Sequence, residues 1–457
     1  MLISLYLEMV KRAVGFLFFA FLFLSACRSP QGMQRANLAY LYDPQELALH
    51  GHFQVENLSD SLSRLHYRLN SEDLLYVKAQ DEEAYEARFE IAYQLIESLK
   101  TQALLDSNAF RFRDRTSAPP QKTISGYFDF RTPERKNAKG QYVLQITLRD
   151  LRRSSDFKSF VLVDKGSINA PQYFRLTDTN RRTLFQAHLP PGVPFRLKHT
   201  VLKPRFYYVS VYQRDFPLAL PPYSSRTSDR FELAPDTTFR VPADSILALP
   251  HDGFFHFRLD TSQWQGFTLY SFYPSFPLVG TPSALAAPLR YLTTKEEYAS
   301  LQSQMGKAMA SKEWIDQFWL ARAGSAERSR LLIQNFYQRV EEANRLFSSY
   351  HEGWKTDRGI VYVIYGPPNK VFRGDAGESW VYGNETSSLS YIFNFLRVDN
   401  PFSANDYELE RRPQYRYGWG QAIEAWRNGH IYNSKDIRRE QDAQDQLQFR
   451  NRSPYWY

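Results

Sequence analysis

The sequence predicts a multi-domain protein in which two β-sandwich domains of immunoglobulin-like size precede an α+β domain. Three observations predict this. The chain has 457 residues, more than one ordinary domain. Aromatic residues make up 16% of it, and Tyr and Phe favour strands. Short runs that alternate polar and apolar side chains fill the chain to about residue 280, and apolar residues then recur every three or four positions.

The N-terminus is typical of a targeting leader rather than of a folded element. Lys11 and Arg12 precede an apolar run from Ala13 to Leu24, which is shorter than the roughly 20 residues that span a bilayer. The run ends in Leu-Ser-Ala-Cys27, which resembles the lipobox of bacterial lipoproteins. We therefore expect residues 1–26 to be a lipoprotein signal peptide and Cys27 to carry lipid.

Cys27 is the only cysteine, so an intramolecular disulfide and a Cys-rich metal site are excluded. Lipid chains bind a membrane because each buried methylene contributes ~0.8 kcal/mol. No aspartate follows Cys27, which resembles sorting to the outer rather than the inner membrane. No acidic cluster follows either, whereas such clusters mark many surface-exported lipoproteins. We expect a periplasm-facing outer-membrane lipoprotein with a polar tether over residues 27–38.

The first predicted β-sandwich domain covers residues 39–168. Its period-two runs indicate half-buried strands, and their spacing suggests an antiparallel sandwich. The Cys-Trp-Cys core of true immunoglobulin domains is absent, so the analogy is architectural. The predicted strands are His52–Glu56, Ser63–Leu69, Glu86–Tyr93, Lys122–Phe130, Tyr142–Leu148 and Phe160–Val163.

The second predicted β-sandwich domain covers residues 169–282 and is rich in proline, which suits turns and edge strands. Its expected strands are Phe206–Tyr212, Thr238–Val241, Gly253–Leu259 and Phe267–Phe272. Two stacked sandwiches behind a lipid anchor would serve as a spacer or a binding arm.

The α+β domain is expected over residues 283–457, with a polar C-terminal tail. The stretch Thr293-Thr294-Lys295-Glu296-Glu297 offers an N-cap with acids in the first turn. Helices are predicted over Trp314–Arg322 and Ser325–Tyr350. The longer one has an apolar stripe from Leu332 to Tyr350 and is expected to turn Gln338, Arg339, Glu341, Glu342 and Arg345 away from it.

A motif follows this helix. Gly353 is expected to end it in a left-handed conformation. Trp354 would anchor the turn, Thr356 and Asp357 would bond neighbouring amides, and Gly359 would permit a backbone that other residues resist.

A strand is predicted next. Ile360–Tyr365 is β-branched and aromatic, which favours a central buried strand. Gly366-Pro367-Pro368 would stop it. Trp380–Tyr382 and Leu389–Phe395 are expected to pair as a hairpin across Gly383-Asn384.

Gly353-Trp354-Lys355-Thr356-Asp357-Arg358-Gly359, the Val-Tyr-Val-Ile-Tyr-Gly-Pro-Pro after it and Trp380-Val381-Tyr382 resemble the GWxTD domain of secreted and lipid-anchored Bacteroidetes proteins. The resemblance covers about residues 290–395. It implies an envelope location and a multi-domain lipoprotein, and no activity. The motif or possible binding residues are Gly353, Trp354, Thr356, Asp357, Arg358, Gly359, Gly366, Pro367, Pro368, Trp380 and Tyr382.

Several function classes receive no support. The net charge of +8 is spread along the chain, so we expect no nucleic-acid partner. The pairs His50/His52 and His251/His256 lack the spacing of a zinc protease. Residues 377–381, Gly-Glu-Ser-Trp-Val, do not match the Gly-x-Ser-x-Gly pattern of a nucleophile elbow. We expect no metal, no cofactor and no identifiable catalytic residue.

Two interpretations of the motif stay open. Lys355, Asp357 and Arg358 either stabilise a local turn through ion pairs or line a ligand site, and Glu378 is a candidate partner of Arg358 or Lys355. Aromatic residues between Gly366 and Tyr382 either pack in a core or form a stacking platform for sugars.

Two functions follow from these observations. The first is a non-enzymatic scaffold or accessory subunit of an outer-membrane assembly, with an envelope protein as partner. The alternative is a glycan-binding or glycan-processing lipoprotein. Beyond residue 395 we expect a short helix over 421–427, a solvated segment over 434–449 and an aromatic end at 454–457 that docks on a partner or on the domain itself.

Overall fold

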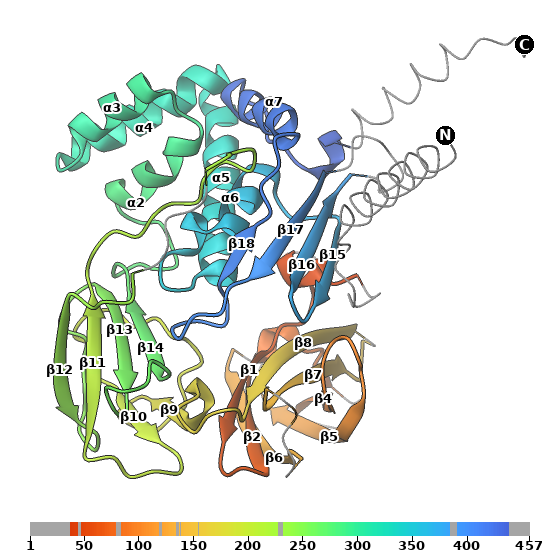
Figure 1. The fold of residues 1–457 in the computed structure, drawn as a ribbon. Helices are drawn as coiled ribbons and strands as arrows, with labels where there is room; N and C mark the ends of the chain where they lie inside the picture. Colours follow the sequence, from red (N-terminus) through yellow and green to blue (C-terminus); the bar gives the residue numbers. More distant parts are fainter. Residues whose placement is uncertain are drawn as a thin grey trace, which may run out of the picture.

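A computed structural model describes residues 37–43, 47–78, 84–117, 121–133, 137, 139–153, 155–226, 232–383 and 391–437. Figure 1 shows the sheets of β1–β14 in one half of the molecule and the helices α2–α7 with β15–β18 in the other. The predicted leader, Cys27, most of the tether and the tail from residue 438 lie outside the described residues. Within the described ranges, no helix has both the length and the apolar character needed to cross a bilayer.

The first β-rich region confirms the predicted strands and places them in two antiparallel sheets. One has the order β1-β2-β6, and the other has the order β3-β4-β7-β8, with β5 also pairing with β4. Residues of both sheets share one hydrophobic core. The strands are β1 (His52–Asn57), β2 (Leu62–Asn70), β3 (Val77–Lys78), β4 (Tyr85–Ile96), β5 (Leu104–Thr116), β6 (Thr123–Arg131), β7 (Gln141–Asp150) and β8 (Ser155–Asp164), with a 3-10 helix, η2 (Ser71–Asp73).

The second β-rich region also has two sheets around a shared core, a β10-β9 pair and a four-stranded sheet in the order β12-β11-β13-β14. All four strands predicted here are present. The elements are η3 (Pro171–Tyr173), β9 (Phe174–Thr177), β10 (Arg196–His199), β11 (Phe206–Tyr212), β12 (Thr237–Pro242), β13 (Gly253–Arg258) and β14 (Phe267–Ser271).

The last region combines helices with the antiparallel sheet β15-β16-β17-β18, as expected for an α+β fold. Strands β16 and β17 pair as the predicted hairpin, and its residues 384–390 lie outside the described part of the chain. The elements are α2 (Pro282–Ala286), η4 (Ala287–Tyr291), α3 (Lys295–Gln304), α4 (Ala308–Ala323), α5 (Ala326–Phe347), η5 (Gly353–Lys355), α6 (Asp357–Tyr365), β15 (Lys370–Gly374), β16 (Gly377–Tyr382), β17 (Tyr391–Arg397), β18 (Tyr407–Leu409) and α7 (Tyr415–Arg427).

Two of the predicted helix starts are confirmed, whereas α4 begins at Ala308 and α7 at Tyr415, each six residues before its predicted start. Thr294 caps α3 in a capping box with Glu297, and Ser325 caps α5. The prediction that every charged residue of α5 faces away from the core is wrong, because Arg339 and Glu342 are buried. Both have buried partners. Arg339 donates to backbone carbonyls, and Glu342 accepts from the hydroxyl of Tyr362 at 2.7 Å.

The predicted strand Ile360–Tyr365 is wrong, because this segment is the helix α6. Every residue from Ile360 to Tyr365 is fully buried, so the run shows no polar face that would reveal a helical period. The Thr356 side chain accepts from the Gly359 amide and starts the helix, and Asp357 lies in its positive first turn. Helix capping and burial on all sides therefore outweigh the strand preference of β-branched residues.

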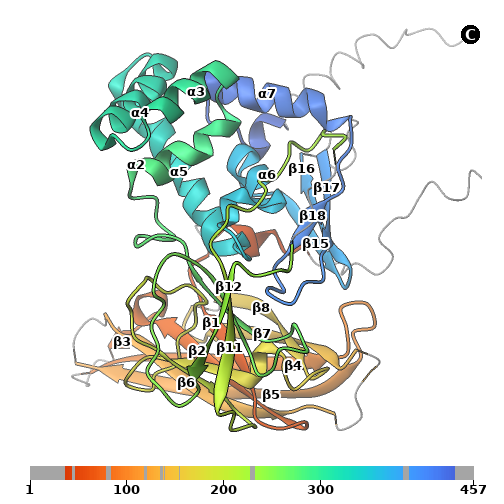
Figure 2. The same cartoon turned by 60° about the vertical axis from the view of Figure 1, so that its left-hand side comes forward.

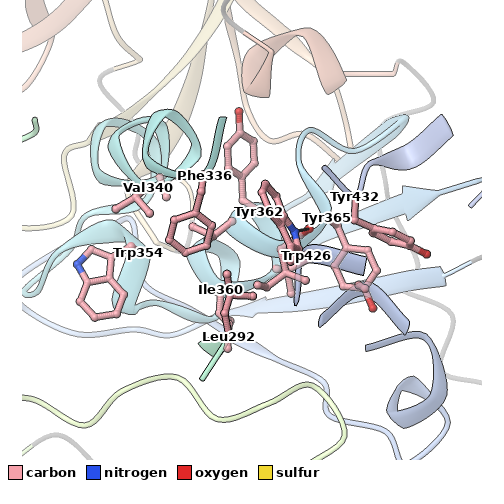
Figure 3. Close-up of a cluster of buried hydrophobic side chains, with 14 of the residues drawn as sticks. Leu292, Phe336, Val340, Trp354, Ile360, Tyr362, Tyr365, Trp426 and Tyr432 are labelled. Carbon is pink, nitrogen blue, oxygen red and sulfur yellow. Dashed lines mark hydrogen bonds between the residues drawn. The ribbon is translucent and has the colours of Figure 1, made fainter. Parts of the chain in front are cut away.

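Helix α6 lies at the centre of the largest hydrophobic core (Figure 3). Ile360, Tyr362 and Tyr365 are packed with residues of α5, α7 and the sheet, including Phe336, Val340, Trp380 and Trp426. The prediction of a buried segment after the motif is therefore confirmed, and only its conformation differs.

The first described residues, 37–43, lie on the last region rather than on the neighbouring β-rich region. The short 3-10 helix η1 (Ala39–Tyr42) lies beside β15 (Figures 1 and 2). The Leu38 amide donates to the Val371 carbonyl at 2.8 Å, and Leu38 is 2% exposed. The last two residues of the predicted tether, Asn37 and Leu38, are therefore fixed to the last region and do not form a free linker.

Candidate functional site

The two glycines of the motif serve close packing. Neither has a positive φ, so the predicted left-handed end at Gly353 is wrong, as is the expectation of an unusual backbone at Gly359. Helix α5 ends earlier, at Phe347. A Cβ on Gly353 would overlap the carbonyl of Ala343, and one on Gly359 would overlap the carbonyl of Gly353. Glycine is required at both positions because a backbone carbonyl occupies the space that a Cβ would need.

Trp354 and Thr356 hold the turn, as predicted. Trp354 is 4% exposed and meets the ring of Tyr291 edge to face at 6.0 Å. Its amide donates to the side chain of Asn344 on α5. The Thr356 hydroxyl donates to the Gly353 carbonyl at 2.7 Å while it accepts from Gly359. The turn is thus bonded both to α5 and to itself.

Asp357 is buried and joins a second, later segment of the chain to the turn. One carboxylate oxygen accepts from the Leu409 amide of β18 at 2.7 Å, and the other pairs with Arg411. Burial raises the pKa of Asp357, and the Arg411 charge opposes this rise. Arg411 also donates to the carbonyl of Leu220, so the motif aspartate reaches a third segment through this guanidinium.

A second buried ionic cluster surrounds Glu378. Its carboxylate accepts from the Tyr42 hydroxyl at 2.7 Å and from the Trp380 indole at 3.1 Å, and it pairs with Arg373 at 2.7 Å. Arg358 completes the cluster at 3.6 Å. Burial alone would raise the pKa of Glu378, but Arg373 and Arg358 outweigh it and lower the pKa to about 2.

The structure settles the open question about ion partners. Glu378 lies beside Arg358, whereas Lys355 pairs with Glu352 at 2.7 Å. The Arg358 guanidinium also stacks on the ring of Tyr407 at 3.9 Å. Asp357 and Arg358 point to different clusters and line no common opening.

Gly366 ends α6, and its φ of 77° is one that favours glycine. Its carbonyl accepts from the Tyr382 hydroxyl at 2.7 Å. Arg339 donates to the carbonyls of Val363 and Ile364, which lie in the last turn of α6, where a cation is favoured. Pro368 is buried and Pro367 half-buried after this helix end.

Trp380 and Tyr382 are fully buried, so they form core rather than a stacking platform for sugars. Histidines of both predicted pairs have partners other than a metal. His50 faces Asp73 at 3.5 Å, and the buried His256 faces Thr268 and the Trp264 carbonyl. Across the described ranges, no cluster of three or more His, Cys, Asp or Glu is arranged to hold a metal.

A pocket of about 390 Å³ lies next to the motif, and no sequence pattern predicted it. One wall comes from residues 216–223, a segment between β11 and β12 that we call the strap. The strap crosses the last region: the Ala219 amide donates to the Lys355 carbonyl at 3.0 Å. The pocket is lined by Pro221 and Tyr223 of the strap, Arg290 and Tyr291 of η4, and Trp419, Gly420, Ile423 and Glu424 of α7.

Sequence reasoning missed Tyr42, Arg411 and the strap, because each acts on the motif from a distant part of the chain. Tyr42 is separated from Glu378 by 336 positions and Arg411 from Asp357 by 54. The only local signals were the surplus of arginine and tyrosine, which is shared by the whole chain.

The geometry defines an α+β domain organised around a buried turn that joins a long helix, a central helix and a four-stranded sheet. Residues 253–428 match the family model of the GWxTD domain, so the chain carries a GWxTD domain. The match begins inside the second β-rich region, at the first residue of β13.

No curated protein matches this chain. Among solved structures, two of Bacteroides uniformis beta-glucuronidase 2 are similar over a short stretch. One is a calcium binding mutant of that enzyme, at 10% identity and a TM-score of 0.18. The other is covalently bound to cyclophellitol-6-carboxylate aziridine, at 11% identity and a TM-score of 0.18. The similarity covers 34% of this chain and 15% of theirs, and at this TM-score it supports no conclusion about fold or function.

Proposed function

We propose that this protein is a lipid-anchored component of the cell envelope that acts as a non-enzymatic scaffold or accessory subunit of an outer-membrane assembly. In this proposal its two β-rich regions are immunoglobulin-like sandwiches, and the lipid is carried by Cys27. An envelope protein is its partner.

The proposal rests on the positions of the charged side chains in and around the motif. Asp357, Arg358 and Glu378 are each buried and bonded to segments from other parts of the chain. Buried charges of this kind fix one arrangement of elements, since removal of one partner leaves an uncompensated charge. A rigid joint between modules suits a scaffold.

The position of η1 supports a tethered arrangement. Asn37 lies ten positions after Cys27, and its side chain accepts from the Val371 amide of β15. Ten extended residues reach at most about 35 Å. An acylated Cys27 would therefore hold the GWxTD domain close to the membrane.

Cys27→Ser tests the anchor. The variant, expressed with its leader, is expected in the soluble envelope fraction, whereas Ser29→Ala, its matched control, stays in the membrane fraction. A processed Cys27→Ser protein that remains in the membrane contradicts the anchor.

The scaffold role is tested separately. Mild crosslinking in membranes followed by detergent extraction is expected to give a discrete complex larger than the monomer, of fixed stoichiometry. A solitary monomer under these conditions contradicts the scaffold.

Glycan binding is the second candidate function. It is favoured by one observation, the aromatic pocket beside the motif, and not by Trp354 or Trp380, which are buried.

A further inference from the structure

We propose that the pocket between the strap, η4 and α7 binds a neutral pyranose sugar ring, and that the GWxTD motif positions its walls. This inference rests on the second candidate function, glycan binding, and names its site and its ligand class.

The lining of the pocket suits a sugar ring. Three aromatic side chains, Tyr223, Tyr291 and Trp419, come from three different elements and line one pocket of about 390 Å³. This volume lies within the usual range of small-molecule sites. Aromatic faces carry partial negative charge, and the C–H groups on one face of a pyranose carry partial positive charge, so the two attract.

Polar groups at the same pocket suit hydroxyls. Arg290 supplies donors and Glu424 supplies acceptors, and both are exposed side chains of the lining. The Tyr291 hydroxyl is buried and finds no hydrogen-bond partner within the part of the chain that the structure describes. Because this oxygen is closed to solvent, Tyr291 offers its ring rather than its hydroxyl to the pocket.

The charges of the lining favour a neutral ligand. Arg290 and Glu424 have opposite charges, so they balance each other around the pocket. An acidic sugar would be attracted by Arg290 but repelled by Glu424. Neighbouring hydroxyls both donate and accept, which matches a guanidinium and a carboxylate at one rim.

Two of the three walls, η4 and the strap, are held by residues of the motif. Trp354 packs edge to face on Tyr291 at 6.0 Å. The Lys355 carbonyl accepts from the strap amide of Ala219 at 3.0 Å. Asp357 pairs with Arg411, which donates to the strap carbonyl of Leu220 at 3.4 Å. The motif residues do not touch the pocket ligand in this arrangement, so they are positioning residues.

Gly420 allows the pocket to be closed without damage to the fold. It lies in α7, and a Cβ built on it meets no described atom within 4 Å. A large side chain at this position would extend into the pocket. Gly420→Ala is the matched control, because it adds only a methyl group and is favoured in a helix.

The test uses the full mature protein in detergent and neutral trisaccharides of glucose, mannose, galactose or N-acetylglucosamine. Binding is measured by titration calorimetry. We expect at least one trisaccharide to bind, Gly420→Phe to weaken its binding by about tenfold or more, and Gly420→Ala to change it less than about twofold. The thermal midpoints of both variants should equal that of the wild type.

The positioning role has its own readout. Trp354→Phe keeps an aromatic ring against Tyr291 and should retain sugar binding, whereas Trp354→Leu should weaken it when both variants are compared below their unfolding transitions. Equal binding by the two variants overturns the positioning role.

Three results overturn the site itself: no trisaccharide binds, binding is unchanged in Gly420→Phe, or an acidic sugar or an apolar peptide binds more tightly than every neutral trisaccharide. Membrane attachment is measured independently through Cys27→Ser, so a failed pocket leaves the anchor result intact.

Discussion

At the scale of single residues, the motif is a set of packing and pairing constraints. Gly353 and Gly359 are needed where two backbones approach, and Asp357 and Arg358 are needed in two separate buried ionic clusters. Each residue type follows from one physical requirement: no Cβ, one negative charge or one positive charge.

Gly353→Ala should destabilise the GWxTD domain by about 1–3 kcal/mol or more, the usual cost of overpacking. The reason is that its Cβ overlaps the Ala343 carbonyl, which is backbone and cannot rotate away. Urea unfolding followed by tryptophan fluorescence measures the change. Gly420→Ala, with open space around it, should be neutral or stabilising, and equal stabilities of the two variants would refute the packing argument.

Glu378→Gln should cost about 3–5 kcal/mol at pH 7, because it leaves Arg373 and Arg358 buried without a counter-charge. The exposed pair of Glu410 and Arg412 gives the control, and Glu410→Gln should cost less than about 1 kcal/mol.

The same residue sets a pH dependence. The pKa of Glu378 is lowered to about 2 in the fold, from an ordinary value of 4.5. Its stabilisation is therefore complete above pH 4.5 and is lost as the pH falls toward 2. The difference in unfolding free energy between wild type and Glu378→Gln should shrink over this interval. A constant difference would mean that the carboxylate charge contributes nothing.

At the scale of elements, what could be predicted from the sequence depended on whether an element has two different faces. Strand β7 alternates buried and less buried residues along its length, and α5 carries a clear apolar stripe, so both were predicted. Helix α6 is buried on every side and was predicted as a strand. Strand β5 was missed because its residues are largely exposed and its place depends on backbone pairing with β4.

The candidate site shows the same limit. The motif residues and the pairing of Glu378 with Arg358 were within reach of sequence reasoning, because they lie within one short stretch of chain. The pocket was not, since its walls come from the strap, η4 and α7, and only the folded chain brings these together.

Thr356→Ala should destabilise α6 by about 1–2 kcal/mol, since it removes the cap that accepts from Gly359 and the bond to Gly353. Thr356→Ser keeps the hydroxyl and should recover most of the loss. Hydrogen exchange at the amides of α6 measures the effect locally. Similar exchange in the two variants would show that the lost methyl group, and not the cap, matters.

At the scale of the whole molecule, the last region contacts both β-rich regions of the described chain. The Asp375 side chain accepts from the Leu99 amide of the first β-rich region at 2.9 Å. Phe402 packs in a small aromatic cluster with Tyr212, Phe254 and Tyr270 of the second. Together with the contacts of η1 and the strap, these contacts join the last region to both β-rich regions.

Tyr42→Phe should destabilise the GWxTD domain by about 1–3 kcal/mol, because it removes a hydrogen bond to a buried carboxylate. Its ring contact with Trp380, at 5.0 Å, stays. Hydrogen exchange in β15 and β16 should increase more than in β1–β8. Exchange that rises equally in the first β-rich region would contradict the assignment of this segment to the last domain.

The contact between Tyr42 and Glu378 also sets an order of events during synthesis, because 336 positions separate the two residues. At about 5–20 residues per second, translation reaches Glu378 about 20–70 s after Tyr42. Throughout that delay the tyrosine and the neighbouring Leu38 have no native surface to cover them. Tyr42 and Leu38 therefore gain their native contacts only after the segment around Glu378 has been made, so a shorter nascent chain is unfinished at the segment that follows the proposed lipid.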